Sequence, residues 1–196
     1  MKNLLMLFFL TVGFYSHAEN YKLDTSHTEI GFSVKHLLIS NVKGRFGKFN
    51  GTFEYDKVTK LLKNLKIEID PASISTSEKD RDEHLRSDDF FDVKKYKKVT
   101  FIGDKADFSE DGKKINLSGK LKIKDKELPV TLEVTLNGEA EIEGTKKIAF
   151  TASTEINRKD WGINWNKALD KGGVAVSEEV KILIEGEANL IQNKTK

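Results

Sequence analysis

Histidine is the residue type in this chain best suited to acid–base or metal chemistry at neutral pH, and the chain has four. His27, His36 and His84 lie too far apart in sequence for the HxH or HExxH spacing of a zinc site, so we predict no metal centre. His36 is either a satisfied histidine at the edge of the core or a polar group that faces a ligand. His84 is either a solvated residue of a helix or a contact at the mouth of a cavity.

The residue types of a catalytic triad also occur, at Asp24, Ser26 and His27. Positions this close in sequence do not allow the mutual geometry of a nucleophile, a base and an orienting acid. The chain has no cysteine, and the GxSxG, P-loop and GxGxxG motifs are absent. The sequence therefore contains no pattern that predicts an enzyme, and we assign no catalytic residue.

The elements that must position these side chains are predicted to be strands, because apolar and polar residues alternate along most of the chain. Ile30, Phe32 and Val34, for example, share one face of the first such segment. A single apolar face favours antiparallel pairing, because parallel strands are usually apolar on both faces. Regular short strands of this kind form sandwiches or barrels. Eight strands are expected, over residues 29–36, 45–55, 63–70, 97–104, 114–124, 127–138, 147–157 and 179–191.

One helix is predicted over residues 78–87, which contain no glycine or proline. Ser75 with Glu78, or Ser77 with Asp80, has the spacing of a capping box at its start. The segment has almost no large apolar side chains, so we expect the helix to lie on one end of the sheet structure rather than to form a core.

Glycine-containing pairs predict two of the turns between strands. Asp111-Gly112 is expected to join the strands 97–104 and 114–124, and Asn137-Gly138 is expected to begin a longer turn. Other glycines in or beside strands are expected to mark bends or bulges of the wall.

Residues 1–18 have the pattern of a secretory signal peptide. The pattern consists of an early lysine, an apolar stretch from Leu4 to Phe14, and small residues before a cut after Ala18. The apolar stretch is too short for a stable membrane anchor. We therefore expect residues 19–196 to form one domain that is exported to the periplasm and is not stably inserted in a membrane.

Charge is balanced along the chain, with 33 Lys and Arg residues against 31 Asp and Glu residues. Most of the cations are lysines that alternate with acids, which is typical of a solvated surface rather than of a phosphate-binding stripe. We therefore expect no nucleic-acid partner.

The chain has 12 Phe and 2 Trp residues, which are many rings for one small domain. They form either the packing of a plain core or the lining of an apolar lumen, since a barrel of about eight strands can hold one small ligand. The strand pattern alone leaves both interpretations open.

Seven blocks of sequence carry a resemblance to a known family. They are residues 21–27 (YKLDTSH), 30–36 (IGFSVKH), 73–76 (SIST), 81–92 (RDEHLRSDDFFD), 99–101 (VTF), 157–163 (NRKDWGI) and 176–180 (VSEEV). In this order and spacing they resemble the YceI-like family of exported polyisoprenoid-binding proteins. The block at residues 81–92 is the most specific of the seven.

The resemblance implies an all-β fold, namely a lipocalin-like barrel of eight antiparallel strands with a short helix near one end. It also implies an elongated apolar cavity for a long isoprenoid or quinone-like tail, no catalytic activity, and often a homodimer. We expect no cofactor besides the bound lipid. Arg81 and Arg86 are either contacts for an anionic head group or partners in salt bridges with Asp82 or Asp88. From strand alternation and motif position, the residues predicted to bind the ligand are Phe32, Val34, His36, Phe46, Phe49, Phe53, Phe90, Phe91, Phe101, Ile156, Trp161 and Ile163.

A non-catalytic lipid carrier is the favoured function. Burial stabilises an apolar tail by roughly 0.8 kcal/mol per CH₂ relative to water, but a bilayer offers the same tail an equally apolar environment. Transfer between membrane and barrel is then near balance, which suits carriage with transient membrane contact. One alternative is a lipid-modifying enzyme that uses His36 or His84 with a nearby acid. Another is a carbohydrate- or stress-related binding module, which needs Trp161 and Trp165 exposed as stacking platforms.

Overall fold

The structure is a computed structural model, and it describes residues 18–168 and 175–192. The predicted signal peptide, apart from Ala18, therefore lies outside the described residues. Within them the chain forms strands, one short α-helix and two 3₁₀ turns. The strands are β1 (Glu19–Leu23), β2 (Glu29–His36), β3 (Ser40–Phe46), β4 (Phe49–Asp56), β5 (Leu61–Ile69), β6 (Ile74–Ser75), β7 (Val99–Phe108), β8 (Lys114–Ile123), β9 (Lys126–Ile142), β10 (Thr145–Asn157) and β11 (Val176–Leu190). The helix is α1 (Lys79–Arg86), and the 3₁₀ turns are η1 (Pro71–Ser73) and η2 (Arg158–Trp161).

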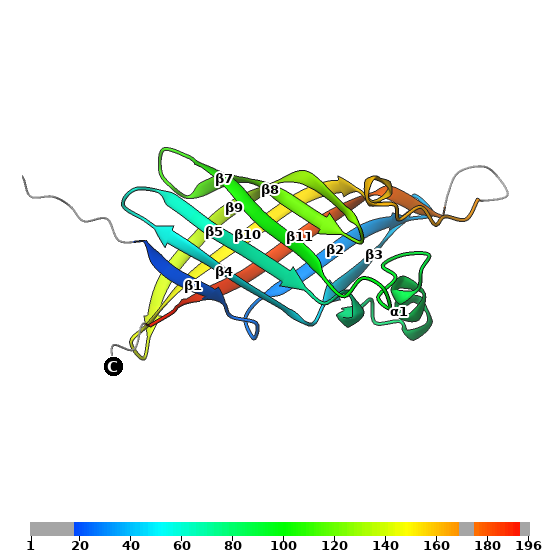
Figure 1. The fold of residues 1–196 in the computed structure, drawn as a ribbon, viewed down its shortest axis with the longest axis horizontal. Helices are drawn as coiled ribbons and strands as arrows, with labels where there is room; N and C mark the ends of the chain where they lie inside the picture. The colour runs from blue at the N-terminus through cyan, green and yellow to red at the C-terminus, as the bar shows by residue number, and fades with distance from the viewer. Residues whose placement is uncertain (1–17, 169–174, 193–196) are drawn as a thin grey trace, which may run out of the picture.

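All strands belong to one antiparallel sheet in the order β1-β4-β5-β7-β8-β9-β10-β11-β2-β3-β6, and β1 also pairs with β11. That last pairing closes the sheet into a barrel (Figure 1). The barrel wall is eight strands wide. β1 and β2 together make up one strand of the wall, because both pair with β11 at different residues, and β4 and β3 make up the next one, because they pair with β1 and β2 respectively. The predicted eight-stranded antiparallel barrel is confirmed, with two of its positions occupied by interrupted strands.

Strand boundaries differ from the prediction where the chain bends. The strand predicted over residues 45–55 is interrupted, because the wall breaks between β3 and β4, and the prediction lacks β1 and most of β3. The turn expected at Asn137-Gly138 is wrong, since β9 continues to Ile142 and the chain turns at Glu143 and Gly144, with φ of 51° and 73°. Asn137 instead lies at the bulge where the register of β9 against β10 shifts, and a bulge accommodates the same residue types as a turn.

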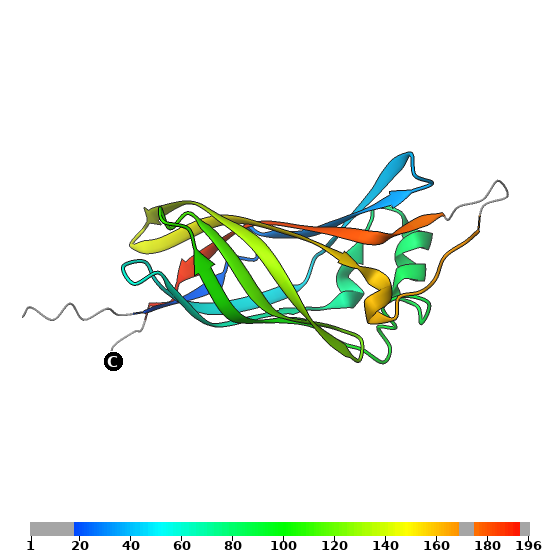
Figure 2. The same ribbon diagram turned by 90° about the horizontal axis from the view of Figure 1, so that it is seen from above.

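Helix α1 begins one residue after Glu78, and neither predicted capping box forms. The Glu78 carboxylate accepts hydrogen bonds from the backbone N–H groups of Asp80 and Arg81, at 3.1 and 2.7 Å. Ser77 does not cap the helix, because its φ of 62° differs from the extended conformation of an N-cap residue and its N–H donates to Ser75 Oγ. The helix lies at one end of the barrel, as predicted (Figure 2).

The interior is packed differently at the two ends. At the end away from α1, Tyr21, Tyr55, Ile148 and Ala188 form a compact buried cluster, and Tyr21 stacks on Phe53 at 5.4 Å. The larger cluster, around Phe101 and Leu121, reaches toward the α1 end. The aromatic residues therefore close one end of the barrel and leave room for a cavity toward the other.

None of the described helices has the length and apolar character needed to cross a bilayer.

Candidate ligand-binding cavity

A cavity of about 530 Å³ occupies the α1 half of the barrel, which is within the usual size of small-molecule sites. Its walls are mostly apolar and come from the inward faces of β2, β3, β5 and β7 to β11, together with α1 and the segment after η2. Alternation along each strand places these side chains inward, because residues two apart share a face. Nine of the twelve predicted ligand-binding residues line it, namely Phe32, Val34, His36, Phe46, Phe90, Phe91, Phe101, Ile156 and Ile163.

The other three predicted residues lie elsewhere. Phe53 lines a smaller apolar cavity of about 90 Å³, and Phe49 packs against the cluster around Tyr21. Trp161 is only 3% exposed and its indole N–H donates to the Leu121 carbonyl at 3.0 Å, so it acts as a core residue beside the cavity. Burial of Trp161 removes the pair of exposed rings that a carbohydrate-binding platform would need.

The two apolar cavities are neighbours along the barrel. Both are lined by Ile30, Ile67, Phe101, Leu132 and Ile184. The smaller cavity therefore continues the apolar interior into the packed end, whose residues Tyr55 and Ile148 also line it. Several lining residues, such as Leu132, are missing from the prediction although they belong to a clearly alternating strand. The pattern indicates their face but not their height in the barrel.

Aromatic rings line the side of the cavity that carries the β2–β3 hairpin. Phe32 lies 5.9 Å from Phe46, and Phe46 meets Phe91 edge to face at 5.8 Å. Phe91 follows α1, so this series of contacts joins the hairpin to the helical segment. Such edge and tilted contacts hold the rings in place without filling the lumen.

Polar groups gather on the wall that α1 provides. Glu78, Asp80, Arg81 and His84 all line the cavity. The His84 ring lies edge-on to Phe90 and to Trp165, at 5.0 and 4.9 Å between centroids. Its Nε2 is 2.8 Å from the exposed carboxylate of Asp89. Of the two interpretations of His84, the structure favours a residue at the cavity mouth.

Arg81 and Arg86 do not form salt bridges with Asp82 or Asp88, which is one of the two interpretations of this pair. Across the part of the chain that the structure describes, neither guanidinium has a carboxylate oxygen within 4.0 Å. Arg81 donates to Thr76 Oγ1 and to the Thr76 carbonyl, and Arg86 donates to the carbonyls of Ala72 and Ile74. Both cations therefore fasten α1 to the preceding segment. Only Arg81 also lines the cavity.

Arg158 is absent from the predicted functional residues, yet it is buried and lines the cavity. Its guanidinium donates to the carbonyls of Ser177, Ile163 and Trp165 at 2.9, 2.8 and 2.8 Å. Burial lowers the pKa of Arg158 from its usual value, and Glu178 opposes this shift. Because one planar guanidinium binds several carbonyls, Arg158 holds the segment at residues 163–165 next to residue 177. Arg158 belongs to the block of residues 157–163 that carries the family resemblance, but its partners are backbone carbonyls, so the residue types at their positions do not indicate that it is buried.

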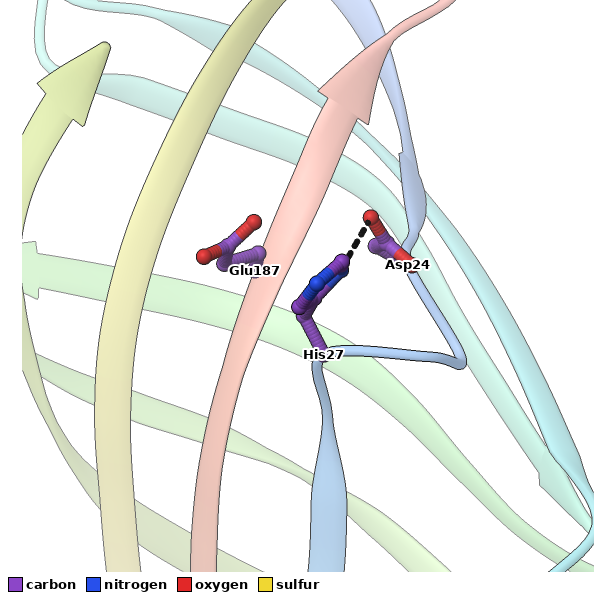
Figure 3. Close-up of side chains that lie close together, drawn as sticks. All are labelled: Asp24, His27 and Glu187. Atoms are coloured by element: carbon purple, nitrogen blue, oxygen red, sulfur yellow. Dashed lines mark hydrogen bonds and ion pairs between the residues drawn. The ribbon is translucent and has the colours of Figure 1, made fainter.

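Asp24, Ser26 and His27, the residues with triad chemistry, do lie together at the β1–β2 turn. Figure 3 shows Asp24 and His27 of this group. Asp24 Oδ1 accepts from Ser26 Oγ at 2.5 Å, while Asp24 Oδ2 is 3.1 Å from His27 Nδ1. Ser26 Oγ also faces His27 Nδ1, at 3.1 Å. A triad needs the acid and the nucleophile on different ring nitrogens, and here both face the same one. The arrangement is therefore a hydrogen-bonded turn.

Glu187 also lies close to Asp24 and His27, and an Asp, a His and a Glu grouped in this way resemble a metal site. The space between the two carboxylates is occupied by a lysine instead, since Lys147 Nζ lies 2.9 Å from Asp24 Oδ2 and 3.0 Å from Glu187 Oε2. Hydrogen bonds from Ser26 and Lys147 hold the pKa of Asp24 well below its usual value. The cluster ties the break between β1 and β2 to β10 and β11.

Comparisons with known proteins agree with this architecture. The model of the YceI-like domain matches residues 21–188. A UPF0312 protein of Staphylococcus epidermidis is 34% identical over 172 residues, which cover 87% of this chain and 97% of that protein. A UPF0312 protein of Staphylococcus aureus is 32% identical over 173 residues, covering 87% and 98% of the two chains.

Solved structures show the same fold. A Campylobacter jejuni YceI protein superposes with a TM-score of 0.70 and 34% identity, covering 87% of this chain and 97% of that one. BcnA of Burkholderia cenocepacia gives a TM-score of 0.70 at 25% identity, covering 84% and 98%. A domain of Saccharophagus degradans described as polyisoprenoid-binding gives a TM-score of 0.65 at 16% identity, covering 87% and 98%, and shows likeness of fold alone. On the family match and the extent of these similarities, the chain belongs to the YceI-like family.

Proposed function

We propose that this protein binds one long-chain apolar lipid, of the isoprenoid class, in the lumen of its barrel and carries it without chemical change. The observation that carries this proposal is the asymmetry of the interior. A cavity of about 530 Å³ with mostly apolar walls occupies the α1 half of a closed barrel, whereas the cavity in the half packed around Tyr21 and Tyr55 measures about 90 Å³. Beyond the polar groups of the mouth, a tail entering at the α1 end would meet mostly apolar side chains, with Thr154 as a polar exception.

The comparisons support the ligand class through the fold. The Saccharophagus degradans domain of similar fold is described as a polyisoprenoid binding domain. An isoprenoid tail is a branched, methyl-studded chain, and walls of Val, Ile, Leu and Phe side chains complement it. The few polar groups at the mouth, including Arg81 and His84, are placed to select the head group.

Carriage also suits the energetics. A bilayer and this lumen are both apolar, so transfer of the tail between them is near balance, whereas release into water costs roughly 0.8 kcal/mol per CH₂. A protein with such a lumen exchanges lipid with membranes and protects it between them. We place this activity in the periplasm, on the basis of the signal-peptide pattern of residues 1–18. A homodimer, implied by the family resemblance, stays a prediction.

Native mass spectrometry of protein purified without detergent tests the proposal. We expect a bound mass of lipid size that is released on activation in the gas phase. Ile156→Trp places a large ring in the cavity and should reduce loading by more than tenfold. Ile102→Trp is the matched control, because Ile102 lies on β7 with its side chain 42% exposed. A parent protein free of lipid, or equal loading of the two variants, would refute lumen binding.

A lipid-modifying enzyme is the second candidate, because His84 pairs with Asp89 at 2.8 Å and lines the cavity. This candidate predicts that His84→Gln abolishes turnover of a bound lipid while lipid loading stays intact. A carrier predicts that the mass of the bound lipid is unchanged after prolonged incubation with either the parent protein or the variant. The masses of lipid extracted before and after incubation decide between the two.

A further inference from the structure

The tip of the β2–β3 hairpin exposes three consecutive large aliphatic side chains. Leu37, Leu38 and Ile39 are 37%, 66% and 85% exposed. The other strongly exposed aliphatic residues of the described chain are not consecutive; Val58, for example, lies in the β4–β5 turn and Ile142 at the end of β9. The hairpin extends beyond the rest of the wall at the end of the barrel that carries α1 (Figure 2). A contiguous apolar tip on a projecting hairpin indicates an interaction site rather than ordinary surface scatter.

Backbone geometry at the same tip is unfavourable for the residues present. Leu37 and Leu38 have φ of 52° and 61°, and the Ile39 N–H closes the turn on the His36 carbonyl at 3.2 Å. A β-turn with positive φ at both central positions normally contains Asn and Gly there, because a bulky side chain is strained in that conformation. Large apolar residues are therefore kept at a position where stability favours small polar ones, which is typical of a functional tip.

The tip is continuous with the lipid cavity. His36, which directly precedes it, lines the cavity, as do Val34 and Val42 on the two strands of the hairpin. The Leu37 N–H also bonds the Ala175 carbonyl at 2.9 Å, which ties the tip to the other side of the mouth. A surface that the tip penetrates would thus lie next to the cavity entrance.

Charge at the hairpin selects the kind of surface. The segment from Ser33 to Arg45 contains Lys35, Lys43 and Arg45 and no acid. Lys35 and Lys43 form none of the ion pairs found among the described residues, whereas Arg45 pairs with Glu29 at 3.3 Å. Both lysines alternate with the inward-facing residues, so they stand on the outer face of the hairpin, below the apolar tip. Apolar side chains flanked by lysines match a bilayer with anionic head groups.

We propose that residues 37–39 insert into an anionic lipid bilayer, with Lys35 and Lys43 against its head groups, and so bring the cavity mouth to the membrane. This proposal rests on the proposed lipid-carrier function and names the surface with which the carrier exchanges its ligand. Insertion is shallow and reversible, because three side chains and two cations form a small anchor.

Vesicle flotation tests the proposal with two kinds of vesicle, one mixing phosphatidylglycerol with phosphatidylethanolamine and one of phosphatidylcholine alone. We expect the protein to float with the anionic vesicles, less so with the neutral ones and less as salt is raised. The double variant Leu38→Ser/Ile39→Ser should lower binding about tenfold or more. Lys35→Gln/Lys43→Gln should weaken binding and flatten its salt dependence.

The matched control is Val58→Ser/Ile142→Ser, which removes two similarly exposed aliphatic residues away from the hairpin and should leave flotation unchanged. All variants share the N-terminus of the parent, so any contribution of residues 1–18 is common to them. Leu37→Asn/Leu38→Gly gives a second test, since it relieves the turn. We expect this variant to unfold at a higher denaturant concentration than the parent, yet to lose flotation.

Two results would overturn the proposal: parent protein that stays off anionic vesicles, or equal losses in the tip and control variants. Sedimentation velocity tests the alternative that the tip binds a second copy of this chain. In that case the Leu38→Ser/Ile39→Ser variant would have a lower molecular mass in solution than the parent. Lipid retention measured by native mass spectrometry without vesicles separates this proposal from the carrier function. Tip variants that keep their lipid but float like the parent would refute membrane insertion alone.

Discussion

The ring of Phe32 occupies the space that a side chain at Gly44 would need. A Cβ built on Gly44 would lie 2.3 Å from Phe32 Cζ, far inside van der Waals contact. The two residues face each other across the β2–β3 pair, where Phe32 and Gly44 are directly opposite. Glycine at this position lets the ring lie flat along the wall. The open lumen beside it therefore depends on the absence of one methyl group.

Gly44→Ala should force the Phe32 ring toward the lumen and reduce lipid loading. We expect a loss of about 1–3 kcal/mol in the free energy of unfolding, as for other overpacked sites, together with a severalfold drop in bound lipid. Gly47→Ala is the control, because its Cβ would meet nothing closer than 3.7 Å. Urea denaturation and native mass spectrometry measure the two effects. Loading equal to that of the parent would show that the ring can move elsewhere.

Alternation and turn residues are enough to predict antiparallel strands, because a wet and a dry face impose period two on each strand, whereas the choice of a barrel over a sandwich comes from the family resemblance. They cannot predict where a strand breaks. The break between β3 and β4 lies at residue 47 and is fixed by the approach of η1, whose Ser73 carbonyl accepts the backbone N–H of that residue at 3.2 Å. That contact joins residues far apart in sequence and leaves no local signal. The Asn137-Gly138 pair shows the converse, since residues typical of a turn lie at a bulge.

Arg158→Lys tests whether the geometry of the guanidinium, rather than its charge, orders the mouth. A lysine keeps the charge but cannot reach three carbonyls that lie in different directions. We expect a loss of about 2 kcal/mol in the free energy of unfolding. Faster hydrogen exchange should be confined to residues 163–168 and 175–177.

Lys159→Ala provides the comparison for Arg158. Lys159 is exposed and pairs with Glu178 at the surface, so its removal should cost less than about 1 kcal/mol. Equal losses for the two variants would contradict the role assigned to the buried fork.

Asp24 should make stability depend on pH in the acid range. Its pKa in the folded chain lies below the unfolded value, because Ser26 and Lys147 donate to the carboxylate. The contribution of Asp24 is then complete above the unfolded pKa of about 3.9 and is lost as pH falls through the folded pKa. Asp24→Asn should cost about 2 kcal/mol at neutral pH, and progressively less below about pH 4.

Unfolding by urea across this pH range measures the Asp24 effect. The exposed Asp104, changed to Asn, is the control and should behave like the parent. A constant difference between Asp24→Asn and the parent at all pH values would mean that shape, rather than charge, stabilises the turn.

The candidate site is predictable from sequence in its chemistry but not in its depth. Alternation selects inward faces, and the selected residues in the α1 half of the barrel line the cavity. Phe49 and Phe53 share one face of β4, but Phe53 lies toward the packed end, where Tyr21 stacks on it. Phe49 is opposite the cavity residue Ile69, yet it packs against the cluster around Tyr21. The height of a residue in a barrel depends on the stagger between strands, and a single sequence does not reveal that stagger.

Asp82 anchors α1 to the barrel, and its removal should loosen the wall of the cavity. The buried carboxylate accepts from the Thr76 N–H at 2.7 Å and from Thr76 Oγ1 at 2.6 Å. Burial alone would raise the pKa of Asp82, but these bonds outweigh it and lower the pKa. Asp82→Ala should cost about 2–3 kcal/mol, because two donors lose their partner inside the fold. Since residues of α1 line the cavity, bound lipid should also leave severalfold faster, measured by transfer to acceptor vesicles. Asp88→Ala, at an exposed position after the helix, is the control and should change neither the free energy of unfolding nor the rate of lipid release. Unaltered lipid release from Asp82→Ala would show that the anchoring of α1 does not control the cavity mouth.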